Sequence, residues 1–257
     1  MAASAPVPSF DLGDQVALIT GAGRGIGAAI ARAAAAAGAH AVLSARSVPQ
    51  LEAVAGEIRA AGGVADVLPW DLAGPDPAGL VTACLQRHGR VDVLVHAAGN
   101  QVRKPLFDYT AGDFDALVAV HLRAAFLLAQ AAGRDMAARG GGAIVFVGSL
   151  TSERLGLPST AGYAAAKSGL LGLMRTFAVA LAPYGVRVNT IIPGFVATEL
   201  TRDVDGTPER ARLTGRVPLG RLGGPDDLAG PAVFLASPAA GYVTGATLTV
   251  DGGWSAA

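Results

Sequence analysis

Short runs of apolar residues alternate along the chain with longer stretches in which apolar residues recur every three or four positions. The longer stretches have the period of helices. The short runs have the length and near-continuous hydrophobicity of strands that are buried on both faces. Seven runs are predicted to be strands: Val16 to Ile19, Ala41 to Leu43, Val64 to Leu68, Val91 to Val95, Ala143 to Val147, Val186 to Ile191 and Thr247 to Val250.

Seven strands separated by helices predict the architecture of the chain. Strands of this kind form parallel sheets covered by helices on both faces, and right-handed crossovers make such a sheet doubly wound. The strands span the sequence, so we expect residues 1–257 to form a single α/β domain. Ligands bind these sheets at the carboxyl ends of the strands. The least regular stretch, Glu199 to Gly220, is predicted to form a lid near that site.

Composition narrows the kinds of partner. Hydrophobic residues make up 51% of the chain and charged residues 16%, which is enough for a large core. Lys plus Arg and Asp plus Glu number 20 each, so net charge favours neither nucleic acid nor an anionic membrane, and a small-molecule partner is expected. The single cysteine, Cys84, cannot form an internal disulfide, and no export signal or membrane span is indicated. We therefore expect a cytoplasmic protein.

The segment after the first strand is rich in glycine and reads Thr20-Gly21-Ala22-Gly23-Arg24-Gly25-Ile26-Gly27. It opens a predicted helix, which is the context of a dinucleotide site. Glycine lets the backbone approach a pyrophosphate closely, and the helix amino end offers N–H groups and a partial positive charge. The alternative is a glycine-rich turn without a ligand. The residues expected to bind the dinucleotide are Gly21, Arg24, Gly25, Ile26 and Gly27.

The end of the second strand carries no acidic residue. An NAD enzyme usually has an acid there that binds the ribose 2′-hydroxyl, whereas this chain has Ala45 followed by Arg46. Arg46, helped by Arg24, can form charge-assisted hydrogen bonds with a 2′-phosphate, which a carboxylate would repel. The pattern favours NADP(H) over NAD(H). The alternative is that both arginines are merely solvated.

Tyr163 and Lys167 lie four residues apart on a predicted helix, so the phenol and the ammonium share one helix face. A free phenol has a pKa of about 10, and a neighbouring positive charge lowers it, which makes tyrosine a useful general acid and base. Ser149, after the fifth strand, could hold a substrate carbonyl while Tyr163 protonates its oxygen. Lys167 could also hold the nicotinamide ribose. The alternative for Ser149 is that it only caps a turn.

Together these motifs resemble the classical short-chain dehydrogenase/reductases over essentially all 257 residues. The glycine run is similar to the T-G-x-x-x-G-x-G segment of that family. The resemblance implies a Rossmann fold, a reaction that interconverts a ketone and a secondary alcohol by hydride transfer, and a homo-oligomer, either dimer or tetramer. It also implies cofactor contacts from Asp71, Leu72, Ala98, Gly99, Pro193, Gly194, Val196 and Thr198, besides Tyr163 and Lys167.

The chain departs from the family pattern at three places. His121 stands where most members have an asparagine that anchors a water in a proton relay, and a histidine can itself relay protons. His96 and Ala97 replace two asparagines, which leaves open how this strand end is braced. Tyr163 follows Ser149 by 14 residues where the family usually has 13, which implies a one-residue insertion, with Ser152 as the alternative hydroxyl.

The substrate stays open at the level of the sequence. The run Gln101-Val102-Arg103-Lys104-Pro105 resembles a segment of gluconate and deoxygluconate dehydrogenases. Its two cations suit the carboxylate of a sugar acid or keto acid, or else form a solvated loop. A 3-oxoacyl thioester or a polyketide or other secondary-metabolite ketone is the alternative substrate. A non-catalytic NADP(H) sensor, or a lyase or epimerase, is a further alternative. His40, His88 and His96 lack metal-ligand spacing, so no metal is expected.

Overall fold

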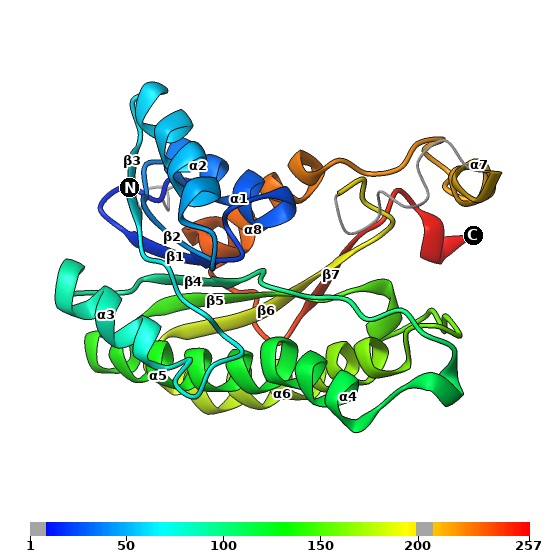
Figure 1. Cartoon of the computed structure of the whole chain (residues 1–257). Coiled ribbons are helices and arrows are strands. Elements are labelled where there is room, and N and C mark those ends of the chain that lie inside the picture. The colour runs from blue at the N-terminus through cyan, green and yellow to red at the C-terminus, as the bar shows by residue number, and fades with distance from the viewer. Residues whose placement is uncertain (1–8, 199–207) are drawn as a thin grey trace.

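A computed structural model of the chain describes residues 9–198 and 208–257. Within them, all seven predicted strands are present, and they form one parallel sheet in the order β3-β2-β1-β4-β5-β6-β7 (Figure 1). Predicted and observed strand ends agree to within two residues. The strands are β1 (Val16–Thr20), β2 (His40–Ser44), β3 (Val64–Val67), β4 (Val93–His96), β5 (Gly142–Val147), β6 (Val186–Pro193) and β7 (Thr247–Val250).

Helices cover both faces of this sheet. They are α1 (Gly25–Ala36), α2 (Val48–Ala60), α3 (Gly79–His88), α4 (Ala111–Val118), α5 (Ala124–Arg139), α6 (Ala161–Leu181), α7 (Pro208–Thr214) and α8 (Ala229–Ala236). α1, α2 and α8 lie on one face, and α3 to α6 lie on the other (Figure 1). Successive strand residues point to opposite faces, so Ile19 packs in the cluster of Ile30 from α1, while Leu18 packs with Leu128 from α5. The predicted doubly wound Rossmann architecture is confirmed.

β1 and β4 are neighbours in the sheet although β2 and β3 lie between them in sequence. The chain therefore leaves β1 towards one edge of the sheet and returns to build the other half from β4. Thr20 and His96 are paired at the carboxyl ends of these two strands. A doubly wound sheet opens a crevice for ligands at this switch point.

A π-helical turn joins α4 to α5. α4 ends at Val118, the π turn covers Ala119–Arg123, and α5 begins at Ala124. A π turn carries an extra residue within an otherwise α-helical segment and is frequent at functional sites. Here it turns His121 into the interior, where only 1% of the residue is exposed.

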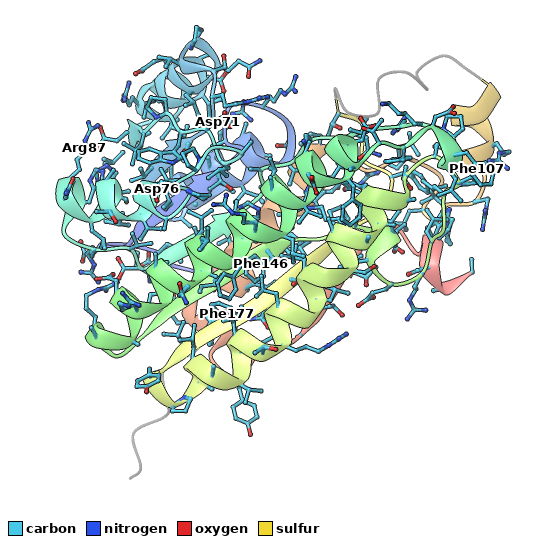
Figure 2. All side chains as sticks on the ribbon, turned by 60° about the horizontal axis from the view of Figure 1, so that its bottom comes forward. Asp71, Asp76, Arg87, Phe107, Phe146 and Phe177 are labelled. Atoms are coloured by element: carbon cyan, nitrogen blue, oxygen red, sulfur yellow. The ribbon has the colours of Figure 1, made fainter. Side chains whose placement is uncertain are left out.

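Two helical stretches on this face are long and apolar. By length and composition alone, Ala111–Arg139 and Ala161–Tyr184 could span a membrane. Helices in the core of a soluble protein meet the same criterion, so one or two such helices are weak evidence for a membrane protein. In the fold, α5 and α6 run side by side against the sheet (Figure 2). The buried share of their most apolar windows is 44% and 33%. Packing on the sheet therefore accounts for part of their hydropathy, and exposed side chains such as Phe126 and Val179 account for another part.

The predicted lid from Glu199 to Gly220 is described only from residue 208 onwards, so residues 199–207 lie outside the described part of the chain. The described remainder begins with α7. It ends in a turn where Val217 packs with Ile192 and Trp254 in a third apolar cluster. This cluster fastens the end of the segment beside the carboxyl end of β6. The lid itself stays a prediction.

Candidate active site

A cavity of about 940 Å³ lies at the carboxyl ends of the strands, around the switch point between β1 and β4. The fold brings every predicted site residue to its wall, although these residues come from eight segments spread over the chain. The predicted residues that line it are Gly21, Arg24, Gly25, Ile26, Gly27, Arg46, Asp71, Leu72, Ala98, Gly99, His121, Ser149, Tyr163, Lys167, Pro193, Gly194, Val196 and Thr198.

The glycine loop closes against the neighbouring strand end. Gly21 has a φ of +70°, and a Cβ atom there would lie 2.8 Å from the backbone nitrogen of Ala98. A Cβ atom at Gly27 would lie 2.2 Å from the carbonyl oxygen of Gly21. Glycine is therefore required at both positions, because the strand end and the first turn of α1 approach the loop too closely for a side chain. Within the described part of the chain, no side chain caps the amino end of α1, so its first N–H groups suit a phosphate.

The wall of the cavity beyond β2 is basic. Arg46 is exposed there, next to Ala45, and Arg24 precedes α1 on the same side. Among the described residues that line the cavity, Asp71 is the one carboxylate, and its Oδ1 accepts a hydrogen bond from the Ala73 N–H at 3.1 Å. This arrangement suits a ligand with phosphate groups, because cations outnumber carboxylates on the wall.

Ser149, Tyr163 and Lys167 meet on the floor of the cavity. The Ser149 side chain lies close enough to the Tyr163 phenol to act on its ionisation. Lys167 is buried, its Nζ donates to the Val147 carbonyl oxygen at 2.5 Å, and Nζ lies 5.8 Å from the centroid of the Tyr163 ring. The helix α6 presents Tyr163 and Lys167 on one face as the i, i+4 spacing predicts.

The electrostatics of this trio differ from the prediction. Burial raises the pKa of Tyr163 above its usual value of 10, while the Ser149 side chain and the positive charge of Arg103 act in the lowering direction. Burial also lowers the pKa of Lys167 from 10.5 to about 7. A lysine that is only partly charged at neutral pH stabilises a phenolate weakly. The expected lowering of the tyrosine pKa by Lys167 is therefore wrong for this structure, and Ser149 and Arg103 act in its place.

The longer segment between Ser149 and Tyr163 begins with a short 3₁₀ turn, Leu150–Ser152. Ser149 Oγ caps this turn by accepting from the Thr151 N–H at 3.3 Å, and it also contacts Tyr163. The Ser152 hydroxyl oxygen accepts from the Ser149 N–H at 3.1 Å. Ser149 therefore caps the turn, which is one of the two alternatives left by the sequence, and Ser152 supports the same turn. The role of Ser149 in holding a substrate carbonyl stays a prediction.

His121 lies edge-on to Tyr163, with ring centroids 5.1 Å apart and an interplanar angle of 88°. Its Nε2 lies 2.8 Å from the Asn100 carbonyl oxygen and 3.2 Å from the Asn100 backbone nitrogen. It donates to the carbonyl when it carries the ring hydrogen, and it accepts from the N–H when Nδ1 carries it. Nδ1 is buried and has no hydrogen-bond partner among the described residues. Burial, followed by the charge of Lys167, lowers the pKa of His121 well below 6.5. The ring is therefore neutral at neutral pH.

His96 braces the strand end that the sequence left open. Its Nε2 lies 3.1 Å from the Val120 carbonyl oxygen, and its Nδ1 lies 3.1 Å from Thr20 Oγ1. The carbonyl can only accept, so Nε2–H donates to it and Nδ1 accepts from the Thr20 hydroxyl. The Thr20 oxygen in turn accepts from the Ala98 N–H at 3.2 Å. One histidine thus ties together the glycine loop, the turn after β4 and the π turn that carries His121.

The two cations after the Ala98-Gly99 turn differ in their surroundings. Lys104 forms an ion pair with Asp113, with Nζ and Oδ2 2.7 Å apart. Arg103 lines the cavity and acts electrostatically on Tyr163. Of the two cations predicted to suit a substrate carboxylate, Lys104 is therefore paired with Asp113, and Arg103 lines the cavity.

Comparisons with known proteins agree with this geometry. Residues 21–255 match the family described as enoyl-(acyl carrier protein) reductase. The chain is 44% identical over 247 residues to L-rhamnose 1-dehydrogenase (NAD(P)(+)) of Azotobacter vinelandii, a match that covers 93% of this chain and 96% of that protein. It is 39% identical over 242 residues to a 3-oxoacyl-[acyl-carrier-protein] reductase of a Synechocystis species, with coverage of 93% and 96%.

A solved structure shows the same architecture. The crystal structure of a gluconate 5-dehydrogenase from Burkholderia cenocepacia, in complex with NADP and tartrate, superposes with a TM-score of 0.92 and 40% identity. The superposition covers 98% of this chain and 99% of that one. These matches span almost the whole sequence. The chain therefore belongs to the short-chain dehydrogenase/reductase family of oxidoreductases.

Proposed function

We propose that this protein is an NADP(H)-dependent oxidoreductase that interconverts a ketone and a secondary alcohol, with a sugar acid or keto acid as substrate. One observation carries the proposal: a phenol, a hydroxyl and a lysine converge on the floor of a cavity whose opposite wall is a glycine loop at the start of a helix. The relatives act on alcohols and ketones by name, and the gluconate 5-dehydrogenase binds NADP.

The wall of the cavity fits a phosphorylated dinucleotide. The crowded positions of Gly21 and Gly27 let the backbone lie against a pyrophosphate, and Arg46 and Arg24 provide charges for a 2′-phosphate. Asp71 and Leu72 at the end of β3, and Pro193 to Thr198 after β6, complete the proposed contact surface. When bound, NADP(H) supplies or accepts the hydride.

The residues of the floor have separate proposed roles. The Ser149 hydroxyl holds the reacting oxygen of the substrate, and Tyr163 donates a proton to that oxygen in reduction or removes it in oxidation. Burial keeps the Tyr163 phenol protonated at neutral pH, which is the form that reduction needs. Lys167 orients the cofactor ribose and receives protons at Nζ. His121 takes the position of the relay asparagine, and its Nδ1, which has no hydrogen-bond partner among the described residues, forms the hydrogen bond with a relay water.

Arg103 favours an anionic substrate. It lies at the cavity close enough to the reacting phenol to influence its ionisation, so a carboxylate held there would sit near the reaction. A sugar acid or keto acid combines such a carboxylate with a carbinol or ketone. The second candidate is a 3-oxoacyl thioester, which the similarity to the Synechocystis reductase favours.

A substrate panel tests the function. Purified protein is assayed in both directions with NADP(H) and NAD(H) on gluconate, a keto acid, L-rhamnose and a 3-oxoacyl thioester. We expect turnover with NADP(H), and we expect Tyr163→Phe to lose at least about a thousandfold in kcat, at the scale of general acid–base catalysis. Tyr242→Phe is the matched control, because Tyr242 is fully exposed and far from the cavity lining. Cofactor binding without turnover would instead favour the sensor.

A second pair of variants tests the substrate class. Arg103→Gln is expected to raise KM for a sugar acid about tenfold or more, because a charged hydrogen bond is lost, and to leave KM for a neutral sugar unchanged. Lys104→Gln is the control from the same loop, since Lys104 pairs with Asp113. Equal KM values for the sugar acid in the wild type and Arg103→Gln contradict the proposed class.

We further propose a cytoplasmic homodimer or homotetramer. The outer faces of α5 and α6 carry Phe126, 41% exposed, and Val179, 78% exposed, on the two most apolar helical stretches described above. A second copy of the chain would bury these side chains. Light scattering checks the mass in solution, and a monomer counts against the proposal.

A further inference from the structure

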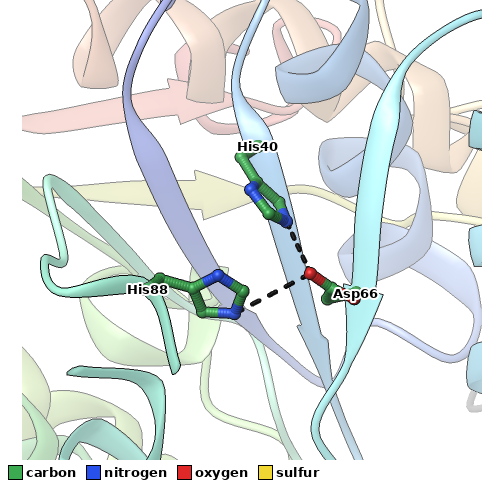
Figure 3. A group of neighbouring side chains, drawn as sticks. All are labelled: His40, Asp66 and His88. Carbon is green, nitrogen blue, oxygen red and sulfur yellow. Dashed lines mark hydrogen bonds and ion pairs between the residues drawn. The ribbon is translucent and has the colours of Figure 1, made fainter. Parts of the chain in front are cut away.

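Three side chains that are distant in sequence converge away from the cavity. His40 begins β2, Asp66 lies on the edge strand β3, and His88 is the last residue of α3. One nitrogen from each ring and one oxygen of the carboxylate lie within 4.8 Å of one another. Figure 3 shows both imidazoles turned towards the same Asp66 oxygen. Sequence spacing gives no sign of this group, because it is assembled by the sheet.

The distances suit a small cation. His40 Nε2 lies 2.7 Å from Asp66 Oδ2, and His88 Nε2 lies 3.9 Å from the same oxygen. A tetrahedral zinc ion with bonds of about 2.0–2.1 Å keeps its ligand atoms about 3.3 Å apart. The two separations from Asp66 Oδ2 lie on either side of that value, and the two imidazole nitrogens are no more than 4.8 Å apart. Small side-chain movements would therefore bring the three ligand atoms to tetrahedral spacing.

His88 has no other use that the fold accounts for. Its side chain is 6% exposed, and Nε2 is buried without a hydrogen-bond partner among the described residues. A buried nitrogen with no partner carries an energetic cost that a metal bond would remove. The ring packs edge-on against His40, with centroids 4.7 Å apart, which holds both donors towards Asp66.

Arg87 completes the surroundings without taking the shared oxygen. Its Nη2 lies 2.7 Å from Asp66 Oδ1, whereas the histidines face Oδ2. A hydrogen bond to the second oxygen is the kind of support that orients a ligating carboxylate.

We propose that His40, Asp66 and His88 bind one divalent transition-metal ion of the zinc class, with solvent in the fourth position. Two imidazoles and one carboxylate are a donor set that zinc accepts. The site lies at the amino end of β2, opposite the end that carries Ser44 and the cavity. Its role is structural: it clips the end of α3 to the edge strand.

Isothermal titration of the full, untagged chain with Zn²⁺, and absorption spectroscopy with Co²⁺, test the proposal. We expect one equivalent per chain, a tetrahedral Co²⁺ spectrum, and a melting temperature that rises with Zn²⁺. His88→Gln and Asp66→Asn should each weaken binding at least about tenfold and abolish the thermal shift, since even residues that only support a ligand are worth that much.

Glu57→Gln is the matched control, because it removes an exposed carboxylate that is paired with Arg32 on the neighbouring helices α1 and α2. It should bind Zn²⁺ as the wild type does. Circular dichroism and NADPH binding establish that each variant is folded. If His88→Gln does not fold, His40→Gln carries the same test at a less buried position. Absence of saturable binding by the wild type, or binding unchanged in the ligand variants, overturns the proposal.

Discussion

His96 should make the fold sensitive to mild acid, and His96→Asn should remove that sensitivity. The ring is fully buried between Thr20 and Val120, and burial lowers its pKa from 6.5 to about 3. The unfolded chain therefore takes up a proton near pH 6.5 that the folded chain does not accept until near pH 3. The contribution of neutral His96 to stability is fully present above pH 6.5 and is lost progressively as the pH falls towards 3.

The size of the effect follows from proton linkage. One proton bound only by the unfolded state lowers the free energy of unfolding by about 1.4 kcal/mol per pH unit. Integrated from pH 8 to pH 5 with the two pKa values above, the loss is about 2 kcal/mol. Asparagine does not titrate, and it is the residue that family members carry at this position. At pH 8 the variant should be less stable by about 1 kcal/mol for each histidine hydrogen bond that it fails to replace.

Urea unfolding followed by circular dichroism measures this difference. Both proteins are unfolded between pH 5 and pH 8 at one protein concentration and one ionic strength. Other groups that titrate, including His121, contribute to both proteins and largely cancel in the comparison. We expect the stability advantage of the wild type to shrink by about 2 kcal/mol between pH 8 and pH 5. Parallel curves would refute the assignment of His96 as a buried neutral brace.

Three further predictions concern the cavity. Arg46→Asp should change the cofactor preference measured by steady-state kinetics. The ratio of kcat/KM with NADPH to kcat/KM with NADH should fall by about tenfold to a hundredfold, because a charged hydrogen bond is exchanged for repulsion. An unchanged ratio contradicts the role of Arg46. Gly99→Ala would place a Cβ atom 2.7 Å from His121 Cε1, so it should displace the ring and lower kcat while NADPH binding measured by fluorescence is retained. Gly56→Ala, with open space at its Cβ position, is the control, and equal kcat values for both variants count against the contact. His121→Asn should keep kcat within about tenfold of the wild type, because asparagine keeps polar atoms for the relay. His121→Leu has no such atoms and should lose more. Similar kcat values for these two variants would exclude a relay role.

The fold and the cavity residues were predictable because their signals are local. Strands buried on both faces are apolar throughout, so the run Ala143 to Val147 already identifies β5. The glycine loop is equally local, since Gly21 and Gly27 are required by contacts within one strand-loop-helix unit and its neighbour.

The remaining features depend on contacts that only the folded chain creates. His96 in the sheet contacts Val120 in the helical layer, and His40 in the sheet contacts His88 at the end of α3. Neither pair has a sequence spacing that would predict the contact. The pKa shifts of Tyr163 and Lys167 were mispredicted because they depend on burial. Lys167 is 4% exposed, and that desolvation, which helical spacing does not reveal, outweighs the charge argument.

The π turn between α4 and α5 holds one residue more than a regular α-helical turn would need. An α-helix advances its side chains by about 100° per residue, and a π turn advances them by less. The segment Ala119–Arg123 therefore takes up the extra residue while Leu128 and Met136 of α5 keep facing the core. Removing one residue there would restore regular α-helix and leave α5 in nearly the same rotational phase, but it would change which side chain of the turn faces Tyr163. A single deletion in this segment should therefore be tolerated far better by the fold than by the site.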